Sequence, residues 1–217
     1  MSTREAVGWE TPAARATSSK VTGRLCCADS PGPFIVAVYR LGETMRTTER
    51  LILRPFQDTD LEAWAALNSD PEVMRYIGGP LTRAESDREA AGINQQWKTE
   101  RFGFLAIERA ADGAFLGAGG LSREQWYPET LEVGWRLDRA YWGHGYASEA
   151  AAHWLAYGFT ELQLPRINSV TDTPNERSIA VMRRLGMTFE RTTDLEFDGE
   201  SFNATVYSMT AEAFRMI

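Results

Sequence analysis

From Thr47 onward the chain shows a regular succession of strand-like and helix-like patterns of apolar residues. The clearest strand pattern covers residues 131–137, where apolar side chains alternate with other side chains. One face of this strand would carry Leu131, Val133, Trp135 and Leu137. The opposite face would carry Glu132, Gly134 and Arg136. Such alternation is typical of a strand with two different faces.

Six further segments have strand character: 51–55, 102–107, 115–121, 166–170, 188–197 and 202–209. The last two flank Asp198-Gly199, a dipeptide that tolerates the positive φ angles of a tight turn. The C-terminal region is therefore predicted to be a β-hairpin.

Helix signals lie between these strands. Asp58 is the predicted N-cap of a helix with Leu61, Trp64 and Ala65 on one face, and Asp70-Pro71 predicts a short helical turn. Thr82 and Glu85 have the spacing of a capping box, which predicts a helix to about Thr99.

Two more helices are predicted in the C-terminal half. Apolar residues at helical spacing indicate a helix over residues 148–160. Thr173 and Glu176 have capping-box spacing with proline between them, and an apolar stripe follows to Gly186, the predicted C-cap glycine.

The predicted order of elements defines the fold class. A strand and two helices precede three consecutive strands, and a strand–helix–strand crossover, a helix and a hairpin follow. A meander joined to a crossover gives an α+β fold with a mixed sheet and helices on both faces.

The N-terminal region differs in composition from the rest of the chain. Residues 1–45 are rich in Ser, Thr, Ala, Gly and Pro and have no apolar periodicity. We therefore expect a domain over residues 46–217, preceded by a disordered or misannotated extension over residues 1–45. The hypothesis that Met45 is the true start predicts no peptide from residues 2–20 in mass spectrometry of the native protein.

Composition excludes several classes of function. The 217 residues carry a formal net charge of -7, which argues against a partner with a phosphate backbone, such as a nucleic acid. The only cysteines are the adjacent Cys26 and Cys27, so the predicted domain has no disulfide, and a cytoplasmic setting fits. No apolar run is long enough to span a membrane.

A glycine-containing loop lies between the strand at 131–137 and the next helix. Gly143 and Gly145 would let backbone N–H groups approach an anion at the positive end of a helix dipole. A lone G-x-G is more often only a turn, and here the Walker motif and the third glycine of the dinucleotide fingerprint are missing.

Four segments in order carry a resemblance to a known family. They are Glu132-Val-Gly-Trp-Arg-Leu137, Tyr141-Trp-Gly-His-Gly-Tyr-Ala-Ser-Glu-Ala150, Asn175-Glu-Arg-Ser178 and Leu185-Gly-Met187. Together they resemble the GNAT superfamily of N-acetyltransferases from about Thr47 to the C-terminus, and most closely the ribosomal-protein N-terminal acetyltransferases. The resemblance implies about seven strands, splayed between the fourth and fifth, with about four helices.

The resemblance also implies acetyl-CoA as cosubstrate and a set of residues that bind it. The CoA diphosphate would lie on the loop residues Trp142, Gly143, His144, Gly145, Tyr146, Ala147 and Ser148. Pantetheine would pair with the strand backbone at Trp135, Arg136 and Leu137, next to Gly134, and with Asn175. For Asn175 the alternative role is that of a residue that only begins a helix.

Two residues would perform the chemistry by analogy with the family. Glu132 would be the base that accepts the amine proton, directly or through water, and its alternative role is that of a solvent-facing carboxylate. Ser178 would donate a hydrogen bond to the leaving thiolate. An α-amine has a pKa of ~8 and a lysine amine one of ~10.4, so an α-amine is already partly neutral at working pH. A weak general base therefore suits an α-amine better than a lysine side chain.

The chain departs from the family pattern at two positions. Met182 stands where a tyrosine acid is common, and Ala140 stands where the loop normally starts with Gln or Arg, so either CoA binding would be looser or Arg139 would substitute. These departures leave open a catalytically silent CoA-binding module, and a nucleotide-phosphate binder has less support. Two histidines and no core cysteines favour no metal site. The family analogy also suggests a homodimer.

Overall fold

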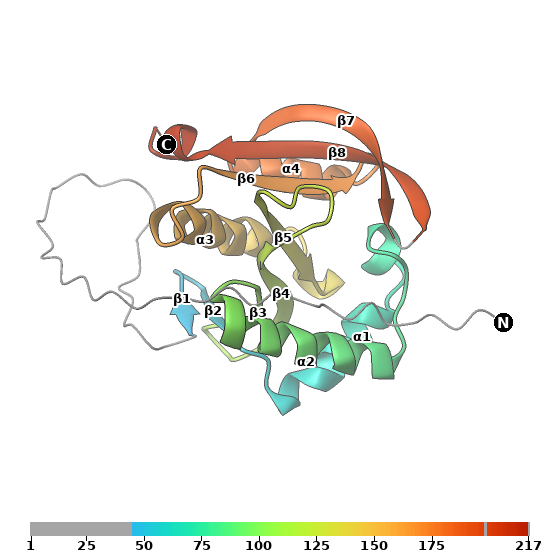
Figure 1. The fold of residues 1–217 in the computed structure, drawn as a ribbon. Coiled ribbons are helices and arrows are strands. Elements are labelled where there is room, and N and C mark those ends of the chain that lie inside the picture. The colour runs from blue at the N-terminus through green and yellow to red at the C-terminus, as the bar shows by residue number, and fades with distance from the viewer. Residues whose placement is uncertain (1–44, 198, 217) are drawn as a thin grey trace, which may run out of the picture. The chain divides into compact units, whose positions relative to one another are not determined.

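The computed structural model describes residues 45–197 and 199–216, which form one mixed sheet with helices packed on it (Figure 1). The strands are β1 (Arg46–Thr47), β2 (Leu51–Arg54), β3 (Phe104–Arg109), β4 (Phe115–Ser122), β5 (Leu131–Leu137), β6 (Arg166–Asp172), β7 (Thr188–Phe197) and β8 (Glu200–Thr210). The helices are α1 (Leu61–Ser69), α2 (Arg83–Glu100), α3 (Tyr146–Thr160), α4 (Glu176–Arg184) and α5 (Ala211–Phe214). Three 3-10 turns are η1 (Asp58–Asp60), η2 (Met74–Tyr76) and η3 (Arg139–Tyr141).

The strand order is β1-β2-β3-β4-β5-β6-β8-β7, and every neighbouring pair except β5–β6 is antiparallel. Helix α3 connects the two parallel strands, as the predicted crossover requires. The predicted α+β class is confirmed. Within the described residues the sheet has eight strands instead of about seven, and there are five α-helices instead of about four, because β1 and α5 are too short to produce a periodic pattern.

Two apolar clusters hold the helices against the sheet. The larger contains most of the inward face of α3, the apolar face of β5 and the buried side of α4, with Trp154 at 0% exposure. The smaller lies between the sheet and helices α1 and α2, around Trp64. Burial of large aromatic side chains on both faces provides much of the apolar area that stabilises the fold.

Several predicted local signals are confirmed. The Thr82 hydroxyl accepts a hydrogen bond from the N–H of Glu85, and the Glu85 carboxylate accepts one from the N–H of Thr82. Gly186 follows α4 with a φ of 78°, and the N–H of Met187 donates to the carbonyl of Met182 across it. This is the hydrogen-bond pattern of a glycine-terminated helix.

Two predicted caps are wrong. Gln57, and not Asp58, caps η1, and the Asp60 carboxylate both completes that cap and pairs with Arg54 at 2.6 Å. Thr173 does not cap α4, because the helix begins at Glu176 and Asn175 is its N-cap, while the Thr173 hydroxyl donates to Asn203 of β8 at 2.8 Å. In both places a tertiary partner competes with the local capping pattern.

Gly134 does not mark a bulge in β5. It pairs in register with Gly120 of β4, and a Cβ atom there would lie 2.9 Å from the ring of Phe104 on β3. The glycine therefore makes room for an aromatic ring on the same face of the sheet.

The predicted N-terminal extension and the hypothesis on Met45 concern mainly residues 1–44, which lie outside the described residues, as does Asp198 of the predicted turn. From Arg46 the chain is part of the sheet: Arg46 is buried, and its guanidinium lies 3.8 Å from the ring centroid of Tyr157. In the described part of the chain, no helix is both long and apolar enough to cross a membrane.

Candidate functional site

The sheet opens between β5 and β6. Only two residue pairs join these strands, Leu131 with Ile167 and Glu132 with Asn168, although each strand has seven residues. Beyond them the Ser169 hydroxyl donates to the carbonyl of Val133 at 3.0 Å. The backbone edge of β5 after Glu132 therefore has no ladder partner on the β6 side, which leaves main-chain groups for an extended ligand.

The loop after β5 presents a row of unbonded backbone donors. Within the described residues, no hydrogen bond uses the N–H groups of residues 143–148, and the first helical bond of α3 runs from Glu149 to Gly145 at 3.0 Å. Gly143 and Gly145 have φ angles of 80° and 81°, which a residue with a Cβ rarely adopts. Orphan donors at the start of a 15-residue helix are chemically suited to bind an anion.

An ion pair between Glu149 in α3 and Arg50, which directly precedes β2, holds this loop in place. The Arg50 Nε atom lies 2.6 Å from Glu149 Oε2, and its Nη1 atom donates to the carbonyl of His144 at 3.0 Å. Glu149 also accepts from the Arg50 N–H at 2.7 Å and from the Thr48 hydroxyl. The Arg50 guanidinium lies 4.7 Å from the ring centroid of Tyr146, the first residue of α3. Arg50 and Glu149 therefore clamp the loop against the start of β2.

We expect substitution of this clamp to weaken selectively the binding of the acetyl-CoA that the sequence resemblance implies. For such a cosubstrate, Arg50→Ala should raise the KM for acetyl-CoA by about fivefold to tenfold and leave the KM for the implied amine acceptor unchanged, because the loop donors would no longer be held in place. Glu149→Gln should act similarly, and the double variant should be no worse than either single one. Steady-state kinetics with each substrate varied in turn tests this; equal changes in both KM values would indicate general loosening of the fold.

Glu132 lies where the two strands separate. Its Oε1 accepts a hydrogen bond from the N–H of Val170 on β6 at 3.2 Å, while its Oε2 is shielded from solvent and has no hydrogen-bond partner within the described residues. Burial, and secondarily the nearby carboxylate of Glu124, raises the pKa of Glu132 well above its usual 4.5. The alternative of a solvent-facing carboxylate is therefore wrong for Oε2, and a raised pKa suits a base that works near neutral pH.

The start of α4 lies at the carboxyl end of β6. Asn175 is its N-cap: the side-chain oxygen accepts from the Ser178 N–H at 3.3 Å, and the side-chain nitrogen donates to Thr171 at 2.8 Å and to the Ser178 hydroxyl at 3.2 Å. Both amide protons of Asn175 are thus used, and one lone pair of its oxygen is left for a ligand donor. Ser178 accepts through its oxygen, so its hydroxyl proton remains available.

In the strand predicted to pair with pantetheine, the Arg136 side chain points away from the opening. It pairs with Glu89 of α2 at 3.0 Å and lies 4.9 Å from the ring centroid of Trp64. The carbonyl of Leu137 accepts from the indole of Trp142 at 2.8 Å. The side chain of Trp135 packs against the larger apolar cluster.

Contacts from α4 reach the glycine loop, so the two predicted halves of the site lie together. The Arg177 guanidinium lies 4.7 Å from the ring centroid of Trp142, and Arg184 donates to the Ser148 hydroxyl at 2.9 Å. Because β5 and β6 are parallel, the loops after them emerge at the same edge of the sheet.

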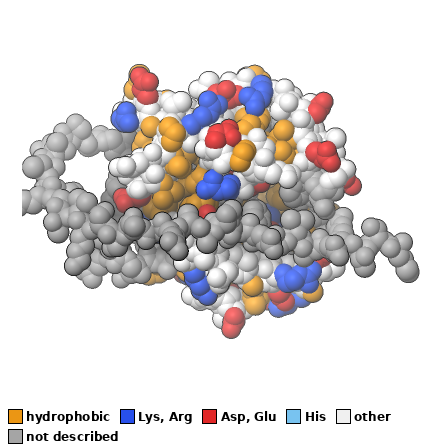
Figure 2. Space-filling view, in the orientation of Figure 1, with side chains coloured by type: hydrophobic (Ala, Val, Ile, Leu, Met, Phe, Trp, Pro, Cys, Tyr) orange, Lys and Arg blue, Asp and Glu red, His pale blue; other side chains and the backbone are white. Residues whose placement is uncertain are grey.

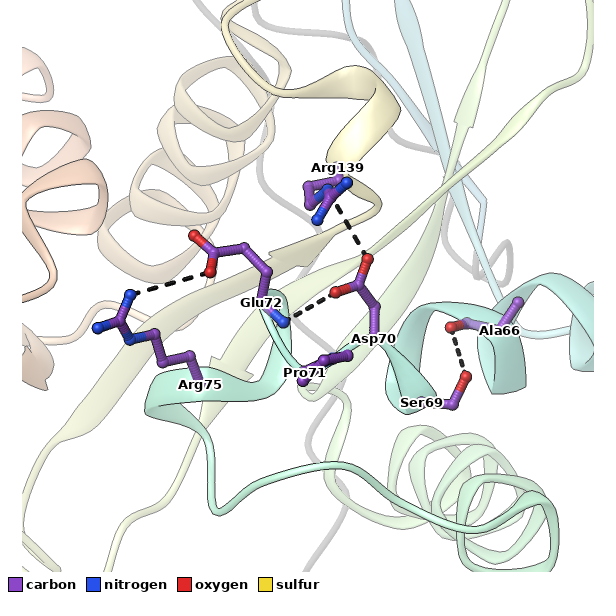
Figure 3. A pocket seen from close by; sticks show the side chains of 7 residues that line it. All are labelled: Ala66, Ser69, Asp70, Pro71, Glu72, Arg75 and Arg139. Carbon is purple, nitrogen blue, oxygen red and sulfur yellow. Dashed lines mark hydrogen bonds and ion pairs between the residues drawn. The ribbon is translucent and has the colours of Figure 1, made fainter.

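Arg139, the predicted substitute at the start of the loop, forms an ion pair with Asp70, with 3.8 Å between Arg139 Nε and Asp70 Oδ2. It also helps to line a shallow pocket of about 790 Å³ (Figure 3). The other lining residues come from α1 and the segment that follows it: Ala66, Ser69, Asp70, Pro71, Glu72 and Arg75.

The two histidines lie in different surroundings. His144 stacks beside Tyr146 at 5.8 Å in the exposed loop. Burial, with a smaller contribution from Arg46, lowers the pKa of His153 to about 4, so this residue is neutral at pH 7. In the described part of the chain, no group of three or more His, Cys, Asp or Glu side chains could hold a metal ion.

On the described part of the face shown in Figure 2, acidic and basic side chains are interspersed. With a net charge of -7, the chain has no excess of cations for binding a phosphate backbone.

The sequence did not predict the contacts that complete the site. These are the Arg50–Glu149 ion pair and the contact of Arg184 with Ser148. Glu149 belongs to the recognised loop motif, but Arg50 lies 99 residues before it and Arg184 36 residues after Ser148. No local pattern signals such pairs, and their only sequence signal is a charged residue at an element boundary.

Comparison with known proteins agrees with this geometry. The profile described as "Acetyltransferase (GNAT) domain" matches residues 50–188. The "Uncharacterized N-acetyltransferase YoaA" of Bacillus subtilis (strain 168) is 32% identical over 171 residues, which cover 75% of this chain and 94% of that protein. The "FsC-acetyl coenzyme A-N(2)-transacetylase" of Aspergillus fumigatus is 31% identical over 178 residues, which cover 76% and 75%.

A solved structure supports the fold. RimL, a ribosomal L7/L12 alpha-N-protein acetyltransferase in complex with coenzyme A, has a TM-score of 0.65 and 17% identity, covering 76% of this chain and 97% of that one. The chain therefore belongs to the GNAT family of acetyltransferases, and it is an enzyme of the N-acetyltransferase class.

Proposed function

We propose that this protein transfers the acetyl group of acetyl-CoA to a primary amine by direct attack, with an α-amine of a protein, peptide or small molecule as the preferred acceptor. The observation that carries the proposal is the coincidence of three features at one edge of the sheet. They are the opening after Glu132, the unbonded N–H groups of residues 143–148 and a buried carboxylate with one oxygen unpaired.

The loop, the edge of β5 and Asn175 would each bind one part of an acyl-CoA. The loop donors would receive the diphosphate, and the unpaired edge of β5 would pair with the amide groups of the pantetheine arm. Asn175 would use its remaining lone pair for a pantetheine N–H. The cosubstrate, when bound, supplies the activated thioester.

The chemistry needs one base and one donor. The amine nitrogen forms a bond to the thioester carbon, the carbon–sulfur bond breaks, and the amine proton passes to Glu132 directly or through one water. The Ser178 hydroxyl donates a hydrogen bond to the departing thiolate, which leaves as CoA. Met182 is buried in the core and contributes no proton.

An α-amine acceptor follows from the balance of pKa values. An α-amine, with a pKa near ~8, is partly neutral at pH 7–8, whereas a lysine amine near ~10.4 is almost wholly protonated. Two proteins compared above have names that specify the acceptor position. RimL is an alpha-N-protein acetyltransferase and the Aspergillus protein is an N(2)-transacetylase, so these names support a protein α-amine and another amine, respectively, as acceptors.

A panel of amines tests the function. Purified protein with acetyl-CoA should release free thiol with peptides that have a free N-terminus, and less with peptides whose only amine is a lysine. Binding of acetyl-CoA in calorimetry without turnover on peptide α-amines, lysine peptides, polyamines or amino acids would favour the silent CoA-binding module. Absence of binding would refute the proposal. Size-exclusion chromatography with light scattering tests the expected homodimer.

A further inference from the structure

The glycine loop has no positively charged side chain of its own that is directed to its N–H groups. The nearest arginine in the chain before the loop, Arg139, pairs with Asp70. Arg50 touches the loop, but its charge is balanced by Glu149 at 2.6 Å. A diphosphate bound there would therefore meet backbone dipoles and no uncompensated cation from either residue.

Arg184 at the end of α4 differs from Arg139 and Arg50 because it has no carboxylate partner among the described residues. It is exposed, it donates to the Ser148 hydroxyl at 2.9 Å, and no carboxylate lies within ion-pair distance of it in the described part of the chain. The adjacent Arg183 points elsewhere, since its Nε donates to the Tyr207 hydroxyl of β8. An arginine without a counter-ion thus lies beside the third residue of α3.

The contact leaves both partners able to bind an anion. Ser148 accepts from Arg184, so its own proton remains to be donated, and the guanidinium has further N–H groups in its planar fork. Both groups adjoin the unbonded N–H groups of residues 146–148. Charge-assisted hydrogen bonds from a guanidinium to phosphate are among the strong polar interactions of proteins.

We propose that Arg184, together with Ser148, binds a phosphate of the CoA cosubstrate and supplies the positive charge that the loop lacks. This inference rests on the proposed function. An acyl-CoA carries a diphosphate and a 3′-phosphate on its ribose, and both offer the same oxygen chemistry.

Calorimetry with CoA and with 3′-dephospho-CoA tests the proposal and distinguishes the two phosphates. Arg184→Gln should weaken CoA binding by about tenfold, as expected for a lost charge-assisted contact. Arg184→Lys should recover part of the affinity because it keeps the charge. An equal loss for both ligands would assign Arg184 to the diphosphate, and a loss confined to CoA would assign it to the 3′-phosphate; both outcomes support the proposal.

The matched control is Arg88→Gln. Arg88 is an exposed arginine on α2 with no ion-pair partner in the described residues, so its substitution makes the same change in net charge away from the loop. Thermal denaturation should show that all variants are folded. In kinetics, Arg184→Gln should raise the KM for acetyl-CoA and leave kcat at saturation unchanged.

Two results would overturn the inference in distinguishable ways. If Arg184→Gln binds CoA as tightly as the wild type and Arg88→Gln do, Arg184 has no role in binding and the proposed function is unaffected. If the wild type itself does not bind CoA, both the inference and the proposed function fail.

Discussion

Replacement of Glu132 by glutamine is expected to remove most of the activity and to make the protein more stable near neutral pH. Glutamine has the same shape, and its oxygen can still accept from the Val170 N–H, but it cannot take a proton from the amine. A general base typically increases the reaction rate by ~10²–10⁴-fold, so kcat should fall by at least about 100-fold. Thiol-release kinetics from pH 6 to 9 measures this.

The stability gain follows from the raised pKa of Glu132. A carboxyl group whose folded pKa exceeds its unfolded value contributes stability that is fully present below the unfolded pKa and is lost as pH rises through the folded pKa. Glutamine does not ionise, so Glu132→Gln avoids this loss. The difference in Tm between variant and wild type should open as the pH rises above about 4.5, and persist at pH 8.

The same pKa predicts the shape of the wild-type activity profile. Glu132 must be deprotonated to act as a base, so the acidic limb of kcat/KM, which reports the free enzyme, should lie well above pH 4.5. Glu200→Gln, an exposed carboxylate in the hairpin, is the control and should change neither activity nor Tm appreciably. If Glu132→Gln keeps kcat within a few-fold of the wild type, Glu132 is not the base.

Replacement of Gly145 by valine is expected to weaken CoA binding by at least about tenfold. Gly145 has a φ of 81°, and the nearest atom to an added Cβ is Arg50 Nη2 at 3.5 Å, so the problem is backbone conformation and not lack of space. A β-branched residue at positive φ is strained by ~1–2 kcal/mol or more. Relief of this strain would rotate the N–H groups of residues 145–148 away from a common ligand.

Gly199→Val is the matched control for this prediction. Gly199 has a φ of 78° and also has open space around its Cβ position, but it lies in the β7–β8 turn. Both variants should lose a similar amount of thermal stability, and only Gly145→Val should lose affinity for CoA in calorimetry. Equal CoA affinity in the two variants would show that the loop conformation is not required.

Much of the fold could be predicted from local patterns. Alternation over residues 131–137 gave β5 with its bounds, and the Thr82 capping box located the start of α2. The patterns failed at Asp58 and Thr173, where Arg54 and Asn203 lie close in space but are not signalled by a local motif. They also gave no sign that Gly134 makes room for Phe104, which lies two strands away in the sheet.

For the candidate site, the sequence alone determined the ordered motifs: the loop glycines, Glu132, and the Asn175–Ser178 helix start. These depend on short-range geometry and on a pattern that recurs in a family. Only the tertiary structure decided which groups complete the site, namely the Arg50–Glu149 clamp, the contact of Arg184 with Ser148 and the buried state of Glu132. The physical reason is that charge compensation and burial depend on distances in space, which the packing of the sheet and helices sets and no local spacing encodes.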